Sequence, residues 1–397
     1  MIGVSILALF AGMALLYGRI IIQNDGITYY ASTRSLVLDR NFDLTNESTY
    51  LNDLRVVHRG NQTVSVYSCG YAYLYAPWLW IFNKLDFFGS WKPYGQNAVI
   101  PFDQSFAIFA GSVLFGLICV FIGLKFAETN GVSPWRAFFI AVAAFIGTPL
   151  AFYTFVTPSF PHAVDSFLTA AAFVLIFLQF KGRNFLLGFV LGLSVMVRAV
   201  NIVFLPPMLL TLLYLEYKNE ERSLLIVLAE VFIGALPAMV TLFHYNWTQY
   251  GSPFRTGYGT PSGVLPGLPR RLYLISIAPS LGIFIWTPIT LLALFGLIAG
   301  SLKFKPAFLL ALSSILLFCA FTVFFGLIYP GFTFGHRYFT HFYIFWVLGL
   351  SEMMKREYWK LIVAGTALAV LWTFLLFNTY FITFASPAAR KALWEDP

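Results

Sequence analysis

The stretch IIQNDGITYYASTRSLVLDR, residues 21–40, marks the point where a long apolar run gives way to a polar segment. Residues 2–22 are predominantly apolar and long enough to cross a membrane. Beyond them, five residues share one helical face: Ile27, Tyr30, Ala31, Arg34 and Leu38. The pattern therefore predicts a membrane span followed at once by a helix that lies along the membrane surface.

The composition is that of an integral membrane protein. Hydrophobic residues make up 59% of the 397 residues, charged residues make up 11%, and the mean hydropathy is +0.77. Soluble domains carry about a quarter charged residues. Continuous apolar runs are typical of spanning helices, not of barrel strands, so we predict an all-α polytopic fold. The cysteines Cys69, Cys119 and Cys319 are widely separated and form no disulfide or metal-binding spacing.

Eleven apolar segments predict about eleven membrane-spanning helices in a single domain, residues 1–397. They lie near 2–22, 104–125, 137–156, 163–180, 185–198, 201–217, 223–244, 279–300, 306–329, 338–354 and 360–382. Residues 71–82 are too few to cross and are predicted to lie at the interface. Residues 2–22 have no charged leader and no cleavage site, which predicts a retained span.

The distribution of cations predicts the orientation. With a cytoplasmic N-terminus, the inner loops hold Lys125, Arg136, Lys181, Arg183, Lys218, Arg222, Lys303, Lys305, Lys355, Arg356 and Lys360. The C-terminus and a large first loop with interfacial helices, residues 23–103, then lie outside the cytoplasm. Cations concentrated in cytoplasmic loops explain the net charge of +8 without a nucleic-acid ligand. We therefore expect membrane lipid and not nucleic acid as the partner.

Two acidic motifs fall on the predicted outer face. Asp25 follows the first span and precedes Gly26, which allows close approach of a backbone or ligand. In TPSFPHAVDSF, His162 and Asp165 are three residues apart at the start of a helix and share one side. Asp25, His162 and Asp165 are therefore candidates for catalysis or for binding a divalent cation. A solvated boundary carboxylate and a His–Asp pair satisfied by backbone remain the alternatives.

Cations and aromatic rings fall on the same predicted face, and the cations suit an anionic substrate. Arg198 interrupts an apolar run, and an intramembrane charge is a functional candidate by default. No carboxylate is obvious near the arginines of the separate outer loops, so we predict that they bind a phosphate. The predicted substrate-binding residues are Tyr29, Tyr30, Arg34, Arg198, Arg255, His336 and Arg337. The simpler alternative for His336 and Arg337 is an interfacial belt residue and a snorkelling arginine.

Six motifs occur in an order that resembles the bacterial multi-spanning glycosyltransferases of the C-type superfamily, relatives of the protein mannosyltransferases and of the aminoarabinose transferase that modifies lipid A. They are NDGITYYASTRSLVLD, GTPLAFYTFVTPSFPHA, GLSVMVRAVN, YGSPFRTGYG, PSLGIFIWTPITLLALFG and FGHRYF. In these enzymes an Asp follows the first span, and Asp25 matches it. Arg198 and Arg337 match basic residues near the lipid phosphate. Asp165 departs from the pattern, which leaves the choice between His162 and Asp165 open.

The resemblance implies a membrane glycosyltransferase in the bacterial inner membrane with an extracytoplasmic site. It implies a polyprenyl-phosphate sugar donor, a glycan, lipid or protein acceptor, inversion at the anomeric carbon and Asp25 as general base. The residues alone agree, because such a donor needs cations for phosphate, polar and aromatic groups for sugar, and a base. A transporter or flippase is the main alternative; it predicts internal repeats, and none is clear. A non-catalytic scaffold or sensor is a further alternative.

Overall fold

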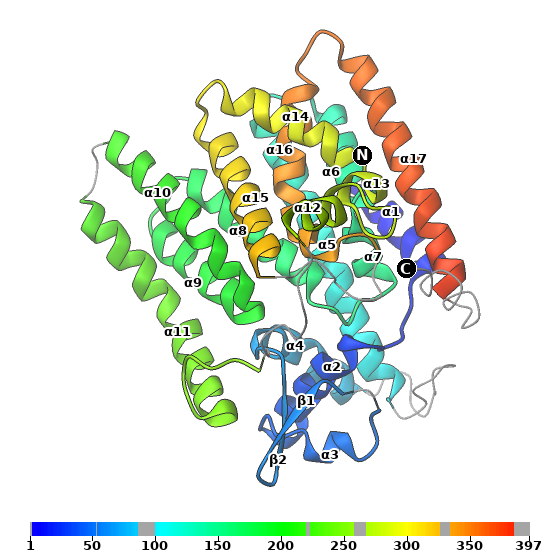
Figure 1. Cartoon of the computed structure of the whole chain (residues 1–397), viewed down its shortest axis with the longest axis vertical. Helices are drawn as coiled ribbons and strands as arrows, with labels where there is room; N and C mark the ends of the chain where they lie inside the picture. The colour runs from blue at the N-terminus through cyan, green and yellow to red at the C-terminus, as the bar shows by residue number, and fades with distance from the viewer. Residues whose placement is uncertain are drawn as a thin grey trace. The chain divides into compact units, whose positions relative to one another are not determined.

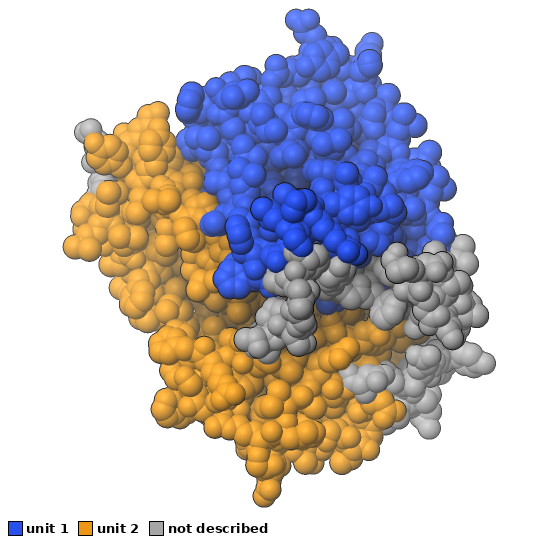
Figure 2. Space-filling view, viewed as in Figure 1, with its two compact units in different colours: residues 1–2, 120–152, 264–397 blue, residues 3–119, 153–263 orange. Residues whose placement is uncertain are grey.

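The structure is a computed structural model, and it describes residues 2–52, 54–85, 100–219, 223–257, 267–325 and 334–384. Helices dominate the chain, which divides into two compact units (Figure 2). Unit 1 comprises residues 1–2, 120–152 and 264–397, and unit 2 comprises residues 3–119 and 153–263.

Unit 2 contains the predicted outer segment, residues 23–103, and the helices between residues 162 and 250 (Figure 1). Its elements are α2 (Asp25–Arg34), the π-helical η1 (Ser35–Asp39), α3 (Thr45–Ser48), β1 (Val56–Arg59), β2 (Gln62–Ser65), α4 (Gly70–Leu85), α8 (His162–Phe177), α9 (Arg183–Val197), the 3-10 helix η2 (Ala199–Phe204), α10 (Leu205–Asn219) and α11 (Leu224–Tyr250). Three helices have residues in both units: α1 (Ile2–Tyr17), α5 (Phe102–Thr129) and α7 (Pro149–Phe155).

All regular secondary structure in the described residues of unit 1 is helical. It contains α6 (Pro134–Ile146), α12 (Leu268–Ser276), α13 (Ile283–Trp286), α14 (Ile289–Ser301), α15 (Pro306–Phe324), the 3-10 helix η3 (Arg337–Phe342), α16 (Tyr343–Met353) and α17 (Trp359–Phe384). Figure 1 shows α14 and α15 in yellow, and α16 and α17 in orange to red.

Each of the eleven predicted apolar segments contains a helix, but eleven crossings are not confirmed. Among the described residues, five helices are long and apolar enough to cross a membrane: Phe102–Thr129, Ala199–Asn219, Leu224–Tyr250, Pro306–Phe324 and Trp359–Tyr380. A sixth span results if α6 and α7, bent by 70°, count as one. Arg222 and residues 326–329 of the ninth predicted segment lie outside the described residues.

Small residues let the main helix pairs of each unit approach closely. In unit 2, a Cβ on Gly188 of α9 would lie 1.9 Å from the Val231 carbonyl oxygen of α11, and one on Gly234 would lie 1.9 Å from that of Phe185. In unit 1, Gly349 of α16 faces Gly296 of α14 in the same way. Such contacts drive helix association where lipid removes the hydrophobic difference between partner and solvent.

The predicted first loop contains helices, as expected, and also a β-hairpin that we did not predict. β1 pairs antiparallel with β2, from Val56 opposite Ser65 to Arg59 opposite Gln62. The two-residue turn begins with Gly60, whose φ is +58°, a conformation that favours glycine. The hairpin docks on the end of α11, because the Tyr250 hydroxyl donates to the Ser65 carbonyl oxygen at 2.6 Å.

Candidate active site

The turn that presents Asp25 is defined by its backbone hydrogen bonds. The Gly26 N–H donates to the Gln23 carbonyl oxygen at 3.0 Å, and the Ile27 N–H donates to that of Asn24 at 3.0 Å. Asn24 has φ 53° and ψ −135°, which is the first central position of a type II′ turn, where glycine is preferred. The backbone is therefore strained immediately before Asp25, the first residue of α2.

Asp25 remains partly accessible and has a cation near it. Its side chain is 19% exposed, and its Oδ1 lies 3.9 Å from Nε of Arg55. Arg55 is held to α2 through its backbone, because its N–H donates to the Thr28 hydroxyl at 2.7 Å. The N-terminus of α2 also favours a negative charge at this position. The carboxylate is therefore accessible to water at the end of a helix.

The Asp25 turn packs directly on the TPSFPHAVDSF motif. A Cβ on Gly26 would lie 1.9 Å from Ser159 Oγ and 2.6 Å from Ser159 Cβ. Ser159 is fully buried, and its hydroxyl has no hydrogen-bond partner among the residues that the structure describes. Upstream, the Arg19 N–H donates to the Phe155 carbonyl oxygen at 2.8 Å. The two acidic motifs that the sequence singled out are therefore neighbours, joined through Gly26 and Ser159.

His162 and Asp165 share α8 but have different surroundings. His162 is buried at the start of the helix, and its ring centroid lies 4.3 Å from that of Tyr153 and 6.1 Å from that of Phe160. Asp165, which is fully buried, accepts hydrogen bonds from Arg198 Nη1 at 2.7 Å and Asn201 Nδ2 at 2.5 Å. The expectation that no carboxylate lies near Arg198 is therefore wrong.

The Asp165–Arg198 ion pair joins α8 to the VRAVN turn. Arg198 is extended, with φ −144° and ψ 114°, and ends α9. Asn201 also donates to the Ser194 carbonyl oxygen at 3.0 Å, which ties the turn back to α9. Loss of one partner of a buried ion pair strongly destabilises a protein. These contacts therefore give Arg198 and Asp165 a structural role. Their predicted phosphate-binding and catalytic roles stay predictions.

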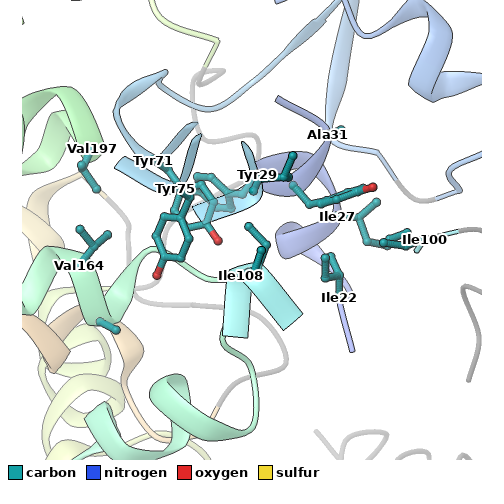
Figure 3. Close-up of a cluster of buried hydrophobic side chains, with 14 of the residues drawn as sticks. Ile22, Ile27, Tyr29, Ala31, Tyr71, Tyr75, Ile100, Ile108, Val164 and Val197 are labelled. Carbon is teal, nitrogen blue, oxygen red and sulfur yellow. The ribbon is translucent and has the colours of Figure 1, made fainter. Parts of the chain in front are cut away.

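The predicted tyrosines form part of a stacked aromatic core. The Tyr29 ring stacks on Tyr67 with centroids 4.4 Å apart and lies 4.9 Å from that of Tyr71, which in turn stacks on Tyr75 at 4.1 Å. Figure 3 shows Tyr71 and Tyr75 side by side. Tyr30 is fully buried, and its hydroxyl donates to Gln104 Oε1 at 2.5 Å. These rings hold α2 against α4 and α5, and their predicted substrate contact stays a prediction.

Arg34 and Arg255 have contrasting environments. Arg34 Nη1 donates to the buried carboxylate of Glu47 at 2.6 Å, and the guanidinium lies 5.5 Å from the Tyr50 ring. Arg34 therefore links α2 to α3 within the predicted first loop. Arg255 is exposed in the segment after α11, where Gly257 lies against the backbone of Val66 next to the hairpin. Of these two predicted substrate ligands, Arg255 is the more accessible.

His336 and Arg337 lie in unit 1, at the start of η3. Their turn is anchored by Phe334, which is fully buried and whose ring centroid lies 5.0 Å from that of Phe152. His336 is buried, and neither ring nitrogen has a hydrogen-bond partner among the described residues. Burial lowers the pKa of His336 to about 3, so its imidazole is neutral at pH 7. Arg337 is half-buried beside Tyr338 and carries the charge.

The predicted metal ligands do not assemble. Among the residues that the structure describes, no group of three His, Cys, Asp or Glu side chains could hold a metal ion. Asp25, His162 and Asp165 are all described, so they are not such a group.

The fold is shared with a known enzyme. The chain matches a crystal structure of the Archaeoglobus fulgidus oligosaccharyltransferase in the apo form with a TM-score of 0.51 and 12% sequence identity, over 96% of this chain and 56% of that one. The same enzyme tethered with an acceptor peptide containing the NVT sequon matches with a TM-score of 0.49, 12% identity and coverage of 96% and 55%. No family model and no curated protein matches the chain.

The likeness shows that this chain shares its fold with that oligosaccharyltransferase, and nothing finer. The chain spans about half of its length. The closer resemblance to protein mannosyltransferases and to the aminoarabinose transferase stays an expectation.

Proposed function

We propose that this protein is a membrane glycosyltransferase that moves a sugar from a polyprenyl-phosphate donor to an acceptor hydroxyl, with inversion at the anomeric carbon. The observation that carries the proposal is the placement of Asp25: a partly exposed carboxylate on the first residue of α2, packed through Gly26 on the buried Ser159. The shared fold supports the reaction class. The acceptor is a glycan, a lipid or a protein.

In this reaction Asp25 is the general base. Its carboxylate takes the proton of the acceptor hydroxyl while the hydroxyl oxygen attacks the anomeric carbon. The bond between that carbon and the phosphate oxygen breaks, and polyprenyl phosphate leaves with the bonding electrons. The displacement is in line, so the base and the leaving phosphate stand on opposite faces of the sugar. Arg337 is our candidate for the cation that stabilises the departing phosphate, and the neutral His336 can add one N–H donor.

The proposal places the site on the extracytoplasmic side of a bacterial inner membrane. Asp25 follows the first apolar helix, α1. The loops richest in cations are predicted to be cytoplasmic, and Asp25 is not in one of them. A lipid-linked donor would hold its first sugar at this depth, with its tail in the bilayer. No nucleotide-sugar phosphate cradle of the glycine-rich type occurs in the sequence.

The test is turnover of a panel of polyprenyl-phosphate sugars by the purified protein in detergent, with candidate acceptors and with heat-inactivated protein as control. We expect one donor to be consumed, with release of polyprenyl phosphate and a product of inverted anomeric configuration. In parallel, the protein in liposomes is assayed for movement of a fluorescent lipid-linked sugar across the bilayer. Movement of the lipid without consumption of any donor would overturn the proposal in favour of a flippase.

A further inference from the structure

Two loops of unit 1 gather cations around one buried carboxylate. Glu352, near the end of α16, is 2% exposed. Four cationic nitrogens lie within 3.8 Å of its carboxylate oxygens: Lys303 at 2.6 Å, Lys305 at 3.7 Å, Lys355 at 3.8 Å and Arg356 at 3.8 Å. Four positive charges against one negative charge leave an excess of three. Figure 1 shows the two loops, between α14 and α15 and between α16 and α17, at the same end of unit 1.

Further charged side chains enlarge this excess. Arg136 of α6 donates to the Met354 carbonyl oxygen at 3.3 Å and lies 4.0 Å from the centroid of Trp359. Lys360 lies 5.9 Å from the same ring. The second loop also contains one exposed carboxylate, Glu357. With these residues included, six cations face two carboxylates, an excess of four.

The cations are not fully balanced by the carboxylate that they surround. Burial lowers the pKa of Lys355, Glu352 opposes that effect, and the ammonium groups of Lys305 and Lys303 lower the pKa further. Like charges held this closely repel one another, and a second anion would relieve the repulsion. The side chains of all four are accessible to one, since Lys303 is 48% exposed and Lys355, the least exposed of the four, is 31% exposed.

Apolar side chains stand exposed beside the cations, outside or at the very ends of the helices. They are Leu302 at 75%, Phe304 at 81%, Tyr358 at 55% and Leu361 at 63% exposed. Phe304 has φ +53°, a left-handed conformation that is an outlier for a bulky residue. The strained backbone thus holds a phenyl ring outward between Lys303 and Lys305. Such strain persists where the surroundings over-determine it, and it is typical of functional positions.

We propose that this basic loop pair, Lys303, Lys305, Lys355 and Arg356, binds the phosphate of an anionic phospholipid, with Leu302 and Phe304 contacting its acyl chains. Phosphate oxygens accept hydrogen bonds from ammonium and guanidinium groups. The exposed apolar side chains favour a lipid over free phosphate, because they are buried only if the ligand brings hydrocarbon. The loops belong to the face predicted to be cytoplasmic, where anionic lipids attract such clusters. The site makes no use of Asp25.

The test measures binding of phosphatidylglycerol to the purified full-length protein in detergent, by native mass spectrometry over a lipid titration. The variant is Lys303→Gln/Lys305→Gln, and its matched control is Lys181→Gln/Lys218→Gln, which removes two exposed cations of the same predicted face outside the cluster. Each cation contributes about 1 kcal/mol to binding an anionic lipid surface, so the variant is expected to bind about 30-fold more weakly. The control is expected to bind like the wild type.

Competition measurements and a further variant distinguish binding of lipid from binding of other ligands. Phosphatidylcholine is expected not to compete, and inorganic phosphate is expected to compete only at far higher concentration than the lipid. Phe304→Ser keeps every charge and is expected to weaken lipid binding while leaving phosphate binding unchanged. If Lys303→Gln/Lys305→Gln fails to fold, Arg356→Gln replaces it. Equal phosphatidylglycerol affinity in the variant and in its control would overturn the proposal, as would displacement by phosphate as effective as by lipid.

Discussion

Gly26 and Ser159 are in direct contact, so closely that a methyl group on Gly26 would lie 1.9 Å from Ser159 Oγ. This contact joins the turn that carries Asp25 to the buried loop that leads into α8. The contact explains why glycine occupies this position of the NDG motif, because a residue with a Cβ would displace α2 from Ser159. Gly26 and Ser159 are therefore positioning residues for Asp25.

Gly26→Ala is expected to lower the apparent melting temperature and to reduce donor turnover. The added methyl group overpacks a buried contact, which costs about 1–3 kcal/mol. Gly12→Ala is the matched control, since a Cβ there meets nothing within 4 Å. In the double variant Gly26→Ala/Ser159→Gly, the Cβ and Oγ that the methyl group meets are gone. We expect turnover to recover substantially in that variant, and no recovery would show that the contact does not position Asp25.

Loss of either partner of the Asp165–Arg198 pair is expected to destabilise the protein. Arg198→Gln leaves a fully buried carboxylate that still accepts from Asn201 but has lost its cation, and loss of one partner of a buried pair costs about 3–5 kcal/mol. Asp165→Asn/Arg198→Gln removes both charges and is expected to regain much of that stability. Thermal unfolding in detergent checks both. If Arg198→Gln unfolded like the wild type and only donor affinity fell, Arg198 would be a phosphate ligand and not a structural one.

Arg337 is expected to behave in the opposite way. It is half-buried at the start of η3, and its proposed role is to bind the donor phosphate. Arg337→Ala should raise the KM for donor and lower kcat, because the charge on the phosphate is left unstabilised in the transition state. The melting temperature should change little. Arg337→Lys keeps the charge but loses the bidentate fork, so partial recovery is expected. An equal loss of melting temperature in both variants would instead indicate a structural arginine.

His336 is expected to make the protein sensitive to acid. Its pKa is lowered to about 3 by burial, below the ordinary value of 6.5. Between these two values the unfolded chain binds a proton that the folded chain does not, so stability is lost as pH falls below 6.5 and is fully present above it. The loss is about 1.4 kcal/mol per pH unit from this group. Unfolding measured from pH 7 to pH 4 should show a shallower decline for His336→Gln, and an unchanged slope would contradict this assignment.

Apolar runs predicted the positions of the helices because they reflect local composition. Every predicted segment contains a helix, and the turn after α9 falls at the predicted VRAVN. The number of crossings could not be read in the same way, because several helices, such as α8 and α9, are shorter than a span. The hairpin was missed although the Gly60–Asn61 dipeptide, between VVHR and QTVS, is a recognised two-residue turn signal.

Sequence motifs identified the residues of the candidate site but not the contacts that those residues make. The sequence identified Asp25, His162, Asp165 and Arg198, yet the pairing of Asp165 with Arg198 joins residues 33 positions apart, and no local pattern reports it. Ser159 was not identified, although it lies within the quoted motif, since its importance arises from contact with Gly26. Long-range contacts of this kind depend on how helices pack, and periodicity carries no information about them.

The central claim is that Asp25 is the base of a glycosyl transfer. The direct measurement is turnover of a verified donor and acceptor by Asp25→Asn, alongside melting temperature and donor binding. Asparagine keeps the shape and hydrogen bonding but takes no proton, so we predict normal folding and donor binding with turnover reduced about 10²–10⁴-fold. Asp25→Glu is predicted to recover little, because the longer side chain displaces the carboxylate by about 1 Å. Near-normal turnover by Asp25→Asn would contradict the account and leave Asp25 as a carboxylate that marks the membrane boundary.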